Sequence, residues 1–167
     1  MTDAARRVEL RPITMDDLPL YEALLTDPRM MTELGGPLAR EGLAEKLRGI
    51  VDDVESGTVW FDVIVEDGVG VGTVCVWDPD EADASTEIGW MVLPEHQGRG
   101  LASTAVQDVL RRARSEPRWT HIDAHPGVTN AASNAICRKA GFSKLGEHDV
   151  DYVGRTLRCA HWRVDVS

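Results

Sequence analysis

The sequence predicts an α/β domain whose mixed sheet of about seven strands carries helices on its faces. Segments typical of strands and helices follow one another in the order β-α-α-β-β-β-α-β-α-β-β. A hairpin signal, Asp67-Gly68, starts a short glycine-containing connection between two of the strand-like segments. The 167 residues contain no linker, internal repeat or low-complexity tract. We therefore expect one domain over residues 1–167.

The first half of the chain supplies a strand, two helices and a hairpin. The first segment alternates apolar and polar side chains. The next begins with an expected N-cap, Asp16 or Asp17, and has Pro19 in its first turn, and the third places apolar residues at helical spacing. Gly57 is expected to end the second helix. Two segments rich in β-branched residues then flank the hairpin turn. The expected ranges are 8–13, 16–27, 38–57, 58–67 and 69–78.

The second half begins with a strand that runs into a glycine-rich turn and a helix. Leu101, Ala105 and Val109 share one face of that helix, and arginines crowd its last turn, where cations favour the helix dipole. A further strand, a short helix ended by Gly141 and two closing strands follow. The expected ranges are 85–93, 101–114, 119–125, 133–142, 142–151 and 155–166.

Composition limits the possible partners and compartments. The net charge of −10, from 28 acids against 18 bases, disfavours nucleic acid and favours a cationic partner such as an amine, or else only solubility. No apolar run is long enough to span a membrane, and the N-terminus lacks a secretory signal core. Cys75, Cys137 and Cys159 match neither a disulfide framework nor a metal-ligand spacing. We therefore expect a cytoplasmic protein with no membrane partner and no metal site.

The glycine turn lies between the strand at 85–93 and the helix that follows. Gly98 and Gly100 flank Arg99 there. Glycine lets a backbone approach a ligand, and the unpaired N–H groups of a helix start carry partial positive charge. This indicates a cradle for a diphosphate, with Arg99 adding charge, although the turn alone fits a structural loop equally well. The Walker ending and the third glycine of a dinucleotide fingerprint are absent.

The surroundings of this turn resemble the acetyl-coenzyme A signature of the GNAT superfamily of N-acetyltransferases, Q/R-x-x-G-x-G/A. Gln97, Gly100 and Ala102 match the signature, and residues 130–142 are similar to the second motif of the family. The opening of the chain and the strand EIGWMV are similar to the branch that acetylates the N-terminal amine of ribosomal proteins. The resemblance implies the acyl-CoA N-acyltransferase fold, a mostly antiparallel sheet with helices on both faces.

The resemblance also implies acetyl-coenzyme A as cosubstrate. Backbone groups of the strand would pair with the pantetheine arm like an added strand, the turn and first helical residues would hold the pyrophosphate, and Asn130 would bind pantetheine. Helix capping is an alternative role for Asn130, and it is the role that we favour for Ser133, three residues on. The expected contacts are Trp90, Met91, Val92, Gln97, Gly98, Arg99, Gly100, Leu101, Ala102, Ser103 and Asn130.

A catalytic base is required because an amine with a pKa near about 10 is mostly protonated at neutral pH. Glu87 is the first candidate, since it lies three residues before the pantetheine-binding segment; an ordinary ion pair would also explain it. His125, at the end of a strand, is the second, although a surface role fits it as well. A longer loop in the alignment would place Asp123 there instead. His121 and His161 are interpreted as structural.

The general acid departs from the family pattern. Many members carry a tyrosine four residues before the second-motif glycine, where it protonates the coenzyme A thiolate, and Cys137 stands there instead. A cysteine on a short helix is more typical of core packing, and we expect packing. Tyr152, expected on a late loop, is a possible substitute.

The sequence constrains the acceptor site less than the cosubstrate site. Residues 26–40 and 146–157 are the expected acceptor loops. Trp60, Trp77 and Trp90 lie on strand segments, where most tryptophans pack in the core but one or two could contact an amine.

Three functions remain compatible with the sequence. The first is an N-acetyltransferase that acts on a protein N-terminus or on a small amine such as an antibiotic or polyamine. The second is an acyl-coenzyme A sensor without chemistry, suggested by the missing tyrosine. The third is a different nucleotide-binding α/β domain. The resemblance allows a homodimer, which nothing in the sequence requires.

Overall fold

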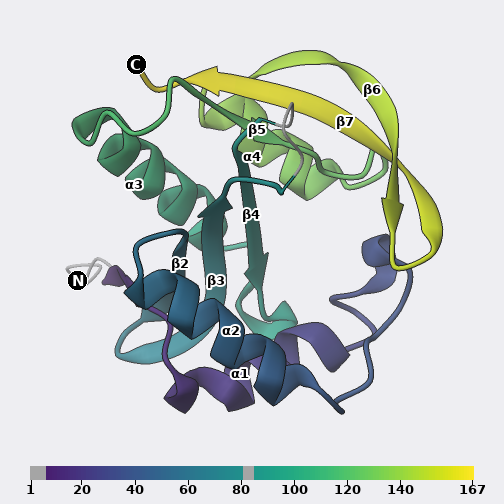
Figure 1. Ribbon diagram of the computed structural model, residues 1–167. Helices are drawn as coiled ribbons and strands as arrows, with labels where there is room; N and C mark the ends of the chain where they lie inside the picture. The colour runs from purple at the N-terminus through teal and green to yellow at the C-terminus, as the bar shows by residue number, and fades with distance from the viewer. Residues whose placement is uncertain (1–6, 81–84) are drawn as a thin grey trace, which may run out of the picture.

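In a computed structural model of the chain, the described residues, 7–80 and 85–167, form a mixed sheet with helices on both faces (Figure 1). The strands are β1 (Val8–Pro12), β2 (Trp60–Glu66), β3 (Val69–Trp77), β4 (Glu87–Val92), β5 (His121–Ala124), β6 (Ser143–Tyr152) and β7 (Arg155–Asp165). The α-helices are α1 (Leu18–Thr26), α2 (Leu43–Glu55), α3 (Leu101–Ser115) and α4 (Ala131–Lys139). Short 3-10 turns are η1 (Met15–Asp17), η2 (Thr32–Leu34) and η3 (Pro94–His96).

The sheet has seven strands in the order β1-β2-β3-β4-β5-β7-β6, so the expected fold class is confirmed. Every neighbouring pair is antiparallel except β4 and β5. These two parallel strands share a single register pair, Glu87 with Asp123. Beyond that pair they diverge, as Figure 1 shows, and among the described residues no strand covers the rest of that edge of β4.

Two hydrophobic layers hold the helices to the sheet. Val63 and Val65 of β2 pack in the layer beneath α1 and α2, whereas Ile64 between them packs on the opposite face with α3 and α4. This alternation is the period of two expected of a strand that is covered on both sides. The helices therefore lie on both faces, as the resemblance implied.

The β2–β3 turn has the geometry that its sequence predicts. Asp67 and Gly68 both have positive φ, 49° and 85°, as a two-residue hairpin turn matching the strand twist requires. The turn pairs Glu66 with Val69 and fixes the register of the two strands.

Several helix boundaries differ from the expected ones for local reasons. The helix expected from residue 38 begins only at Leu43, because Gly42 adopts a left-handed conformation with φ 82°. The helix expected from Ser133 begins at Ala131, two residues earlier. Its cap is Asn130, whose side-chain oxygen accepts a hydrogen bond from the Ser133 N–H at 3.1 Å. The assignment of the cap to Ser133 was therefore wrong.

The N-terminal strand is tied to the first helix by a half-buried ion pair. The Arg11 guanidinium donates to both carboxylate oxygens of Asp17, at 2.9 and 2.7 Å. The backbone N–H of Thr14 donates to the same carboxylate at 2.9 Å. Arg11 is the main cause that lowers the pKa of Asp17 below its usual value.

The helices of the described residues are too short or too polar to cross a membrane.

Candidate active site

A cleft of about 810 Å³ opens where β4 and β5 part. Its walls come from the exposed edge of β4, the start of α3, the segment after α1 and the β6–β7 hairpin. The hairpin tip lies beside the segment that follows α1 (Figure 1). There the Arg155 side chain approaches Gly35. Residues from both expected acceptor loops line the cleft: Arg29, Met30, Glu33, Leu34, Tyr152 and Leu157.

The glycine turn forms an open cradle at one end of the cleft. Gly98 and Gly100 have φ of 75° and 77°, and a Cβ atom added at either position would meet no atom of the described residues within 4 Å beyond its chain neighbours. Gly100 is the N-cap of α3, and no side chain caps this helix start. The first-turn N–H groups are thus available to an anion, and the helix dipole adds partial positive charge.

Ten of the eleven residues expected to contact acetyl-coenzyme A line the cleft, and Arg99 does not. Its Nη1 donates to both oxygens of Glu66 at 3.1 Å, and its Nη2 donates to the Glu95 carbonyl at 2.8 Å. Glu66 is 6% exposed, and a buried carboxylate requires a charged partner. The guanidinium of Arg99 therefore neutralises this carboxylate and is not directed at a diphosphate in the cleft.

The side chain of Gln97 has a structural bond of its own. Its Nε2 donates to the Val92 carbonyl at 2.8 Å and so joins the end of β4 to the turn. Asn130 lines the cleft while its Oδ1 caps α4, which leaves its Nδ2 facing no hydrogen-bond partner among the described residues. The structure thus gives each of these two side chains a local role, which their family roles do not exclude.

The two candidate bases lie together on the cleft wall. Glu87 begins β4, and His125 directly follows β5, so the single register pair between these strands brings them close. The His125 Nε2 is 3.8 Å from a carboxylate oxygen of Glu87. Asp123, the alternative base, is 2% exposed and does not line the cleft, so it cannot receive a proton from a substrate there.

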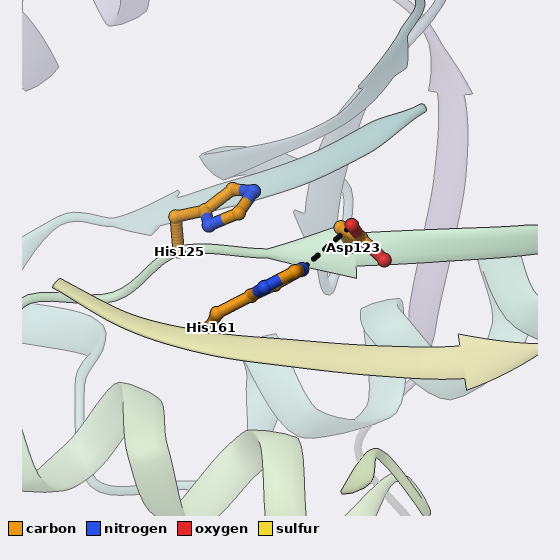
Figure 2. A group of neighbouring side chains, drawn as sticks. All are labelled: Asp123, His125 and His161. Carbon is orange, nitrogen blue, oxygen red and sulfur yellow. Dashed lines mark hydrogen bonds and ion pairs between the residues drawn. The ribbon is translucent and has the colours of Figure 1, made fainter. Parts of the chain in front are cut away.

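Asp123 instead belongs to a buried ion pair behind His125. Its two oxygens accept from Arg163 at 2.6 and 2.7 Å, and one of them also contacts the His161 Nε2 at 2.7 Å. Figure 2 shows His125 and His161 with their rings stacked next to this carboxylate. Arg163 and His161 lower the pKa of Asp123, although burial opposes them.

Three imidazoles meet at this point, from three different elements. His161 of β7 stacks on His125 with ring centres 4.8 Å apart, and His148 of β6 meets His125 edge-on at 4.9 Å. Burial, and then the two neighbouring histidines, lower the pKa of His125 to about 4. His125 is therefore neutral at physiological pH, as a proton acceptor must be.

The sequence did not reveal His148 or the role of His161. Their positions follow from the pairing of β6 with β7 and of β7 with β5, which joins residues far apart in the chain. His161 was interpreted as structural, and the alternation of its strand gives no sign that it faces a histidine.

The two candidate general acids, Cys137 and Tyr152, differ in burial. Cys137 is fully buried and burial raises its pKa to about 12, so the expected core role is confirmed. Tyr152 ends β6 rather than lying on a loop, and it lines the cleft. Burial raises the pKa of Tyr152, which keeps its hydroxyl protonated at neutral pH.

The tryptophans divide between core and cleft. Trp60 is buried, meets Trp119 edge-to-face at 4.7 Å and carries the Arg112 guanidinium 3.7 Å above its ring. Trp77 and Trp90 line the cleft, as the sequence allowed for one or two of the three. They offer aromatic surface to a substrate amine.

This fold and cleft define an acyl-coenzyme A N-acyltransferase architecture, in which a parallel strand pair parts beside a glycine turn and an uncapped helix start. The acetyltransferase (GNAT) domain family matches residues 7–143. The chain therefore belongs to the GNAT acetyltransferase family, which confirms the expected superfamily and class of enzyme.

Among curated proteins, the uncharacterized N-acetyltransferase YoaA of Bacillus subtilis (strain 168) is 32% identical over 76 residues. This match covers 46% of the chain and 43% of YoaA, so it spans less than half the length of that relative.

Solved structures match over nearly the whole chain. The acetyl transferase of Salmonella typhimurium that modifies the N-terminal serine of 50S ribosomal subunit protein L7/L12 has a TM-score of 0.81 at 18% identity, covering 96% and 95% of the two chains. Spermidine N-acetyltransferase of Vibrio cholerae, in complex with CoA and spermine, has a TM-score of 0.79 at 20% identity, covering 95% of each. At these identities the likeness shows the fold, and it does not select an acceptor.

Proposed function

We propose that the protein transfers an acetyl group from acetyl-coenzyme A directly to a primary amine, on a protein N-terminus or a small molecule. The observation that carries this proposal is the open cradle of Gly98 and Gly100 at an uncapped helix start, at one end of a cleft whose wall holds Glu87 and His125. Membership of the GNAT family and the acceptors named for the structural neighbours support it.

The residues of the cleft fit the expected cosubstrate. The N–H groups at the start of α3 would hold the pyrophosphate, and the free edge of β4 would pair with the pantetheine arm. When bound, acetyl-coenzyme A supplies an activated acetyl thioester. The unpartnered edge of β4 also carries backbone N–H groups suited to polarising a carbonyl oxygen.

Glu87 and His125 would take the proton from the amine. A carboxylate near the cleft attracts an ammonium ion, and the neutral imidazole 3.8 Å away can receive the proton directly or through water. Tyr152 would protonate the departing thiolate, because its hydroxyl is protonated and lies on the cleft wall. The free cysteines of the chain support a reducing compartment such as the cytoplasm.

The test is the release of free thiol from acetyl-coenzyme A across a panel of amines, at neutral and alkaline pH. We expect turnover with at least one peptide N-terminus or small amine. Tight binding of acetyl-coenzyme A with no turnover on any amine would instead identify a sensor.

The cradle itself is tested by Gly100→Asp, which places a negative charge where phosphates should lie. Gly57→Asp is a matched control, because Gly57 has the same φ of 77°, equally open surroundings and a position outside the cleft lining. We expect loss of acetyl-coenzyme A binding, measured by calorimetry, in Gly100→Asp alone. Equal affinity in both variants would refute the cradle.

A further inference from the structure

The imidazole cluster behind the cleft wall has a composition that the proposed acetyl transfer does not explain. One base and a positioning group would suffice, yet Asp123, His125 and His161 place three potential ligand atoms within 4.8 Å of one another (Figure 2). His148 adds a third imidazole, its ring centre 4.9 Å from that of His125 and 5.6 Å from that of His161. Imidazole nitrogens with one carboxylate oxygen are the donor set that zinc and neighbouring transition ions prefer.

A second observation points to a missing partner at the same place. The Nδ1 of His125 is buried, and no group among the described residues makes a hydrogen bond to it. Leaving a buried polar atom unsatisfied costs about 1–3 kcal/mol, so such atoms usually face a water or an ion. In Figure 2 the His125 ring lies over His161, with one of its nitrogens turned toward that ring.

We propose that Asp123, His125 and His161 bind a divalent transition-metal ion of the zinc class, reversibly, in the cluster behind the cleft wall. The ion takes the place of the proton between the His161 Nε2 and the Asp123 Oδ2, which are 2.7 Å apart. From a neutral ring that proton moves to the Nδ1 of His161, and from a protonated ring it leaves to solvent, so that a neutral imidazole binds the ion in either case. His125 supplies the third ligand, and water completes the coordination.

The required adjustment is small. Tetrahedral zinc with bonds of about 2.0–2.1 Å needs donor atoms about 3.4 Å apart. The present separations, 2.7 Å at the His161–Asp123 contact and 4.8 Å at most, lie on either side of that distance. Each separation therefore changes by about 1.4 Å or less.

The charges around the cluster determine the expected affinity for the metal ion. Glu87 lies 3.8 Å from His125 and adds negative charge on the cleft side. Arg163, which donates to both oxygens of Asp123, opposes a second cation there. We therefore expect binding in the micromolar range, weaker than at a structural zinc site.

Binding is measured on tag-free protein by equilibrium dialysis with Zn²⁺, and by the visible absorption of Co²⁺, which reports its ligands. We expect one ion per chain, with affinity reduced at least tenfold in His125→Gln and in His161→Gln. His121→Gln is the matched control, because His121 lies on β5 outside the ligand cluster, and it should bind like the wild type. Circular dichroism spectra verify that each variant is folded.

Two results would overturn the proposal: no Zn²⁺ bound in the micromolar range, or equal binding by the wild type and both glutamine variants. Neither measurement requires catalysis, so the metal site and the proposed acetyl transfer are tested independently. Either proposal can be refuted while the other is supported. The one consequence that rests on the proposed function is inhibition of turnover by Zn²⁺, because the ion occupies His125.

Discussion

At the scale of single residues, the chemistry of the cleft depends on which groups are buried together. His125 is neutral because burial, and then two neighbouring histidines, lower its pKa, whereas contacts with Arg163 and His161 lower the pKa of Asp123 against the effect of burial. The same residue types at the surface would titrate near their usual pKa values. Residue type alone therefore gives three candidate bases. Burial excludes Asp123, because only Glu87 and His125 line the cleft.

Glu87 is the residue whose replacement best tests the base. We expect Glu87→Gln to lower kcat/KM by about 10²–10⁴-fold, with little change in acetyl-coenzyme A affinity. The loss should be largest at the lower end of the pH range, where less of the amine is already deprotonated. Steady-state thiol release from neutral to alkaline pH measures it.

Glu45→Gln is the control for this measurement, because Glu45 is exposed on α2 and lies outside the cleft lining. It removes the same charge and should keep wild-type rates. A Glu87→Gln rate equal to that of the wild type would remove Glu87 as the base.

At the scale of elements, the close approach of β3 to β4 determines the position of the cleft edge. A side chain at Gly72 would overlap the Met91 carbonyl oxygen of the neighbouring strand. Glycine at this position therefore allows β4 to lie where its other edge faces the cleft.

Two alanine substitutions separate this effect from ordinary glycine flexibility. Gly72→Ala should reduce the free energy of unfolding by about 1–3 kcal/mol, because backbone atoms must move apart. Gly49→Ala, on α2 with nothing within 4 Å of the added carbon, should increase it by about 0.4–1 kcal/mol. Urea denaturation measures both changes. An unchanged or greater stability of Gly72→Ala would contradict the close packing.

Most elements could be predicted from the sequence because periodicity and turn residues are local. The hairpin at Asp67-Gly68, all seven strands and the glycine turn at the start of α3 were found in this way. The helix boundaries near Gly42 and Asn130 could not be predicted in this way. The first depends on the left-handed conformation of Gly42, and the second on whether Asn130 or Ser133 caps the helix.

The site was predictable only where a linear motif defines it. The turn and the β4 segment form such a motif, and nearly all of their residues line the cleft. The partner of Arg99 lies on β2 and the partners of His125 lie on β6 and β7. These contacts follow from long-range strand pairing, which periodicity does not report.

At the scale of the whole molecule, acid stability depends on charges that the fold has paired. The net charge of −10 makes the chain strongly acidic, which favours cationic amines near its surface. Asp17 contributes through Arg11, which ties β1 to the start of α1. Because its pKa is lower in the folded state, this contribution is complete above the unfolded pKa of about 3.9 and is lost as pH falls through the folded pKa.

We therefore expect Asp17→Asn to be less stable than the wild type at neutral pH. The difference should shrink toward zero once the pH falls below the folded pKa, because both side chains are then uncharged. Urea denaturation at neutral pH and in strong acid measures the change. Asp16→Asn, at the exposed neighbouring position, should show a smaller difference, and an equal loss in the two variants would contradict the role of the Arg11 pair.

The single register pair between β4 and β5 has a practical consequence for handling the protein. A molecule bound between β4 and β5 would contact the strands on both sides of the cleft. Because it binds the native state, it would increase the free energy of unfolding. Preparations kept without such a molecule are the more fragile form. Coenzyme A in the buffer should lengthen their shelf life and help crystals grow.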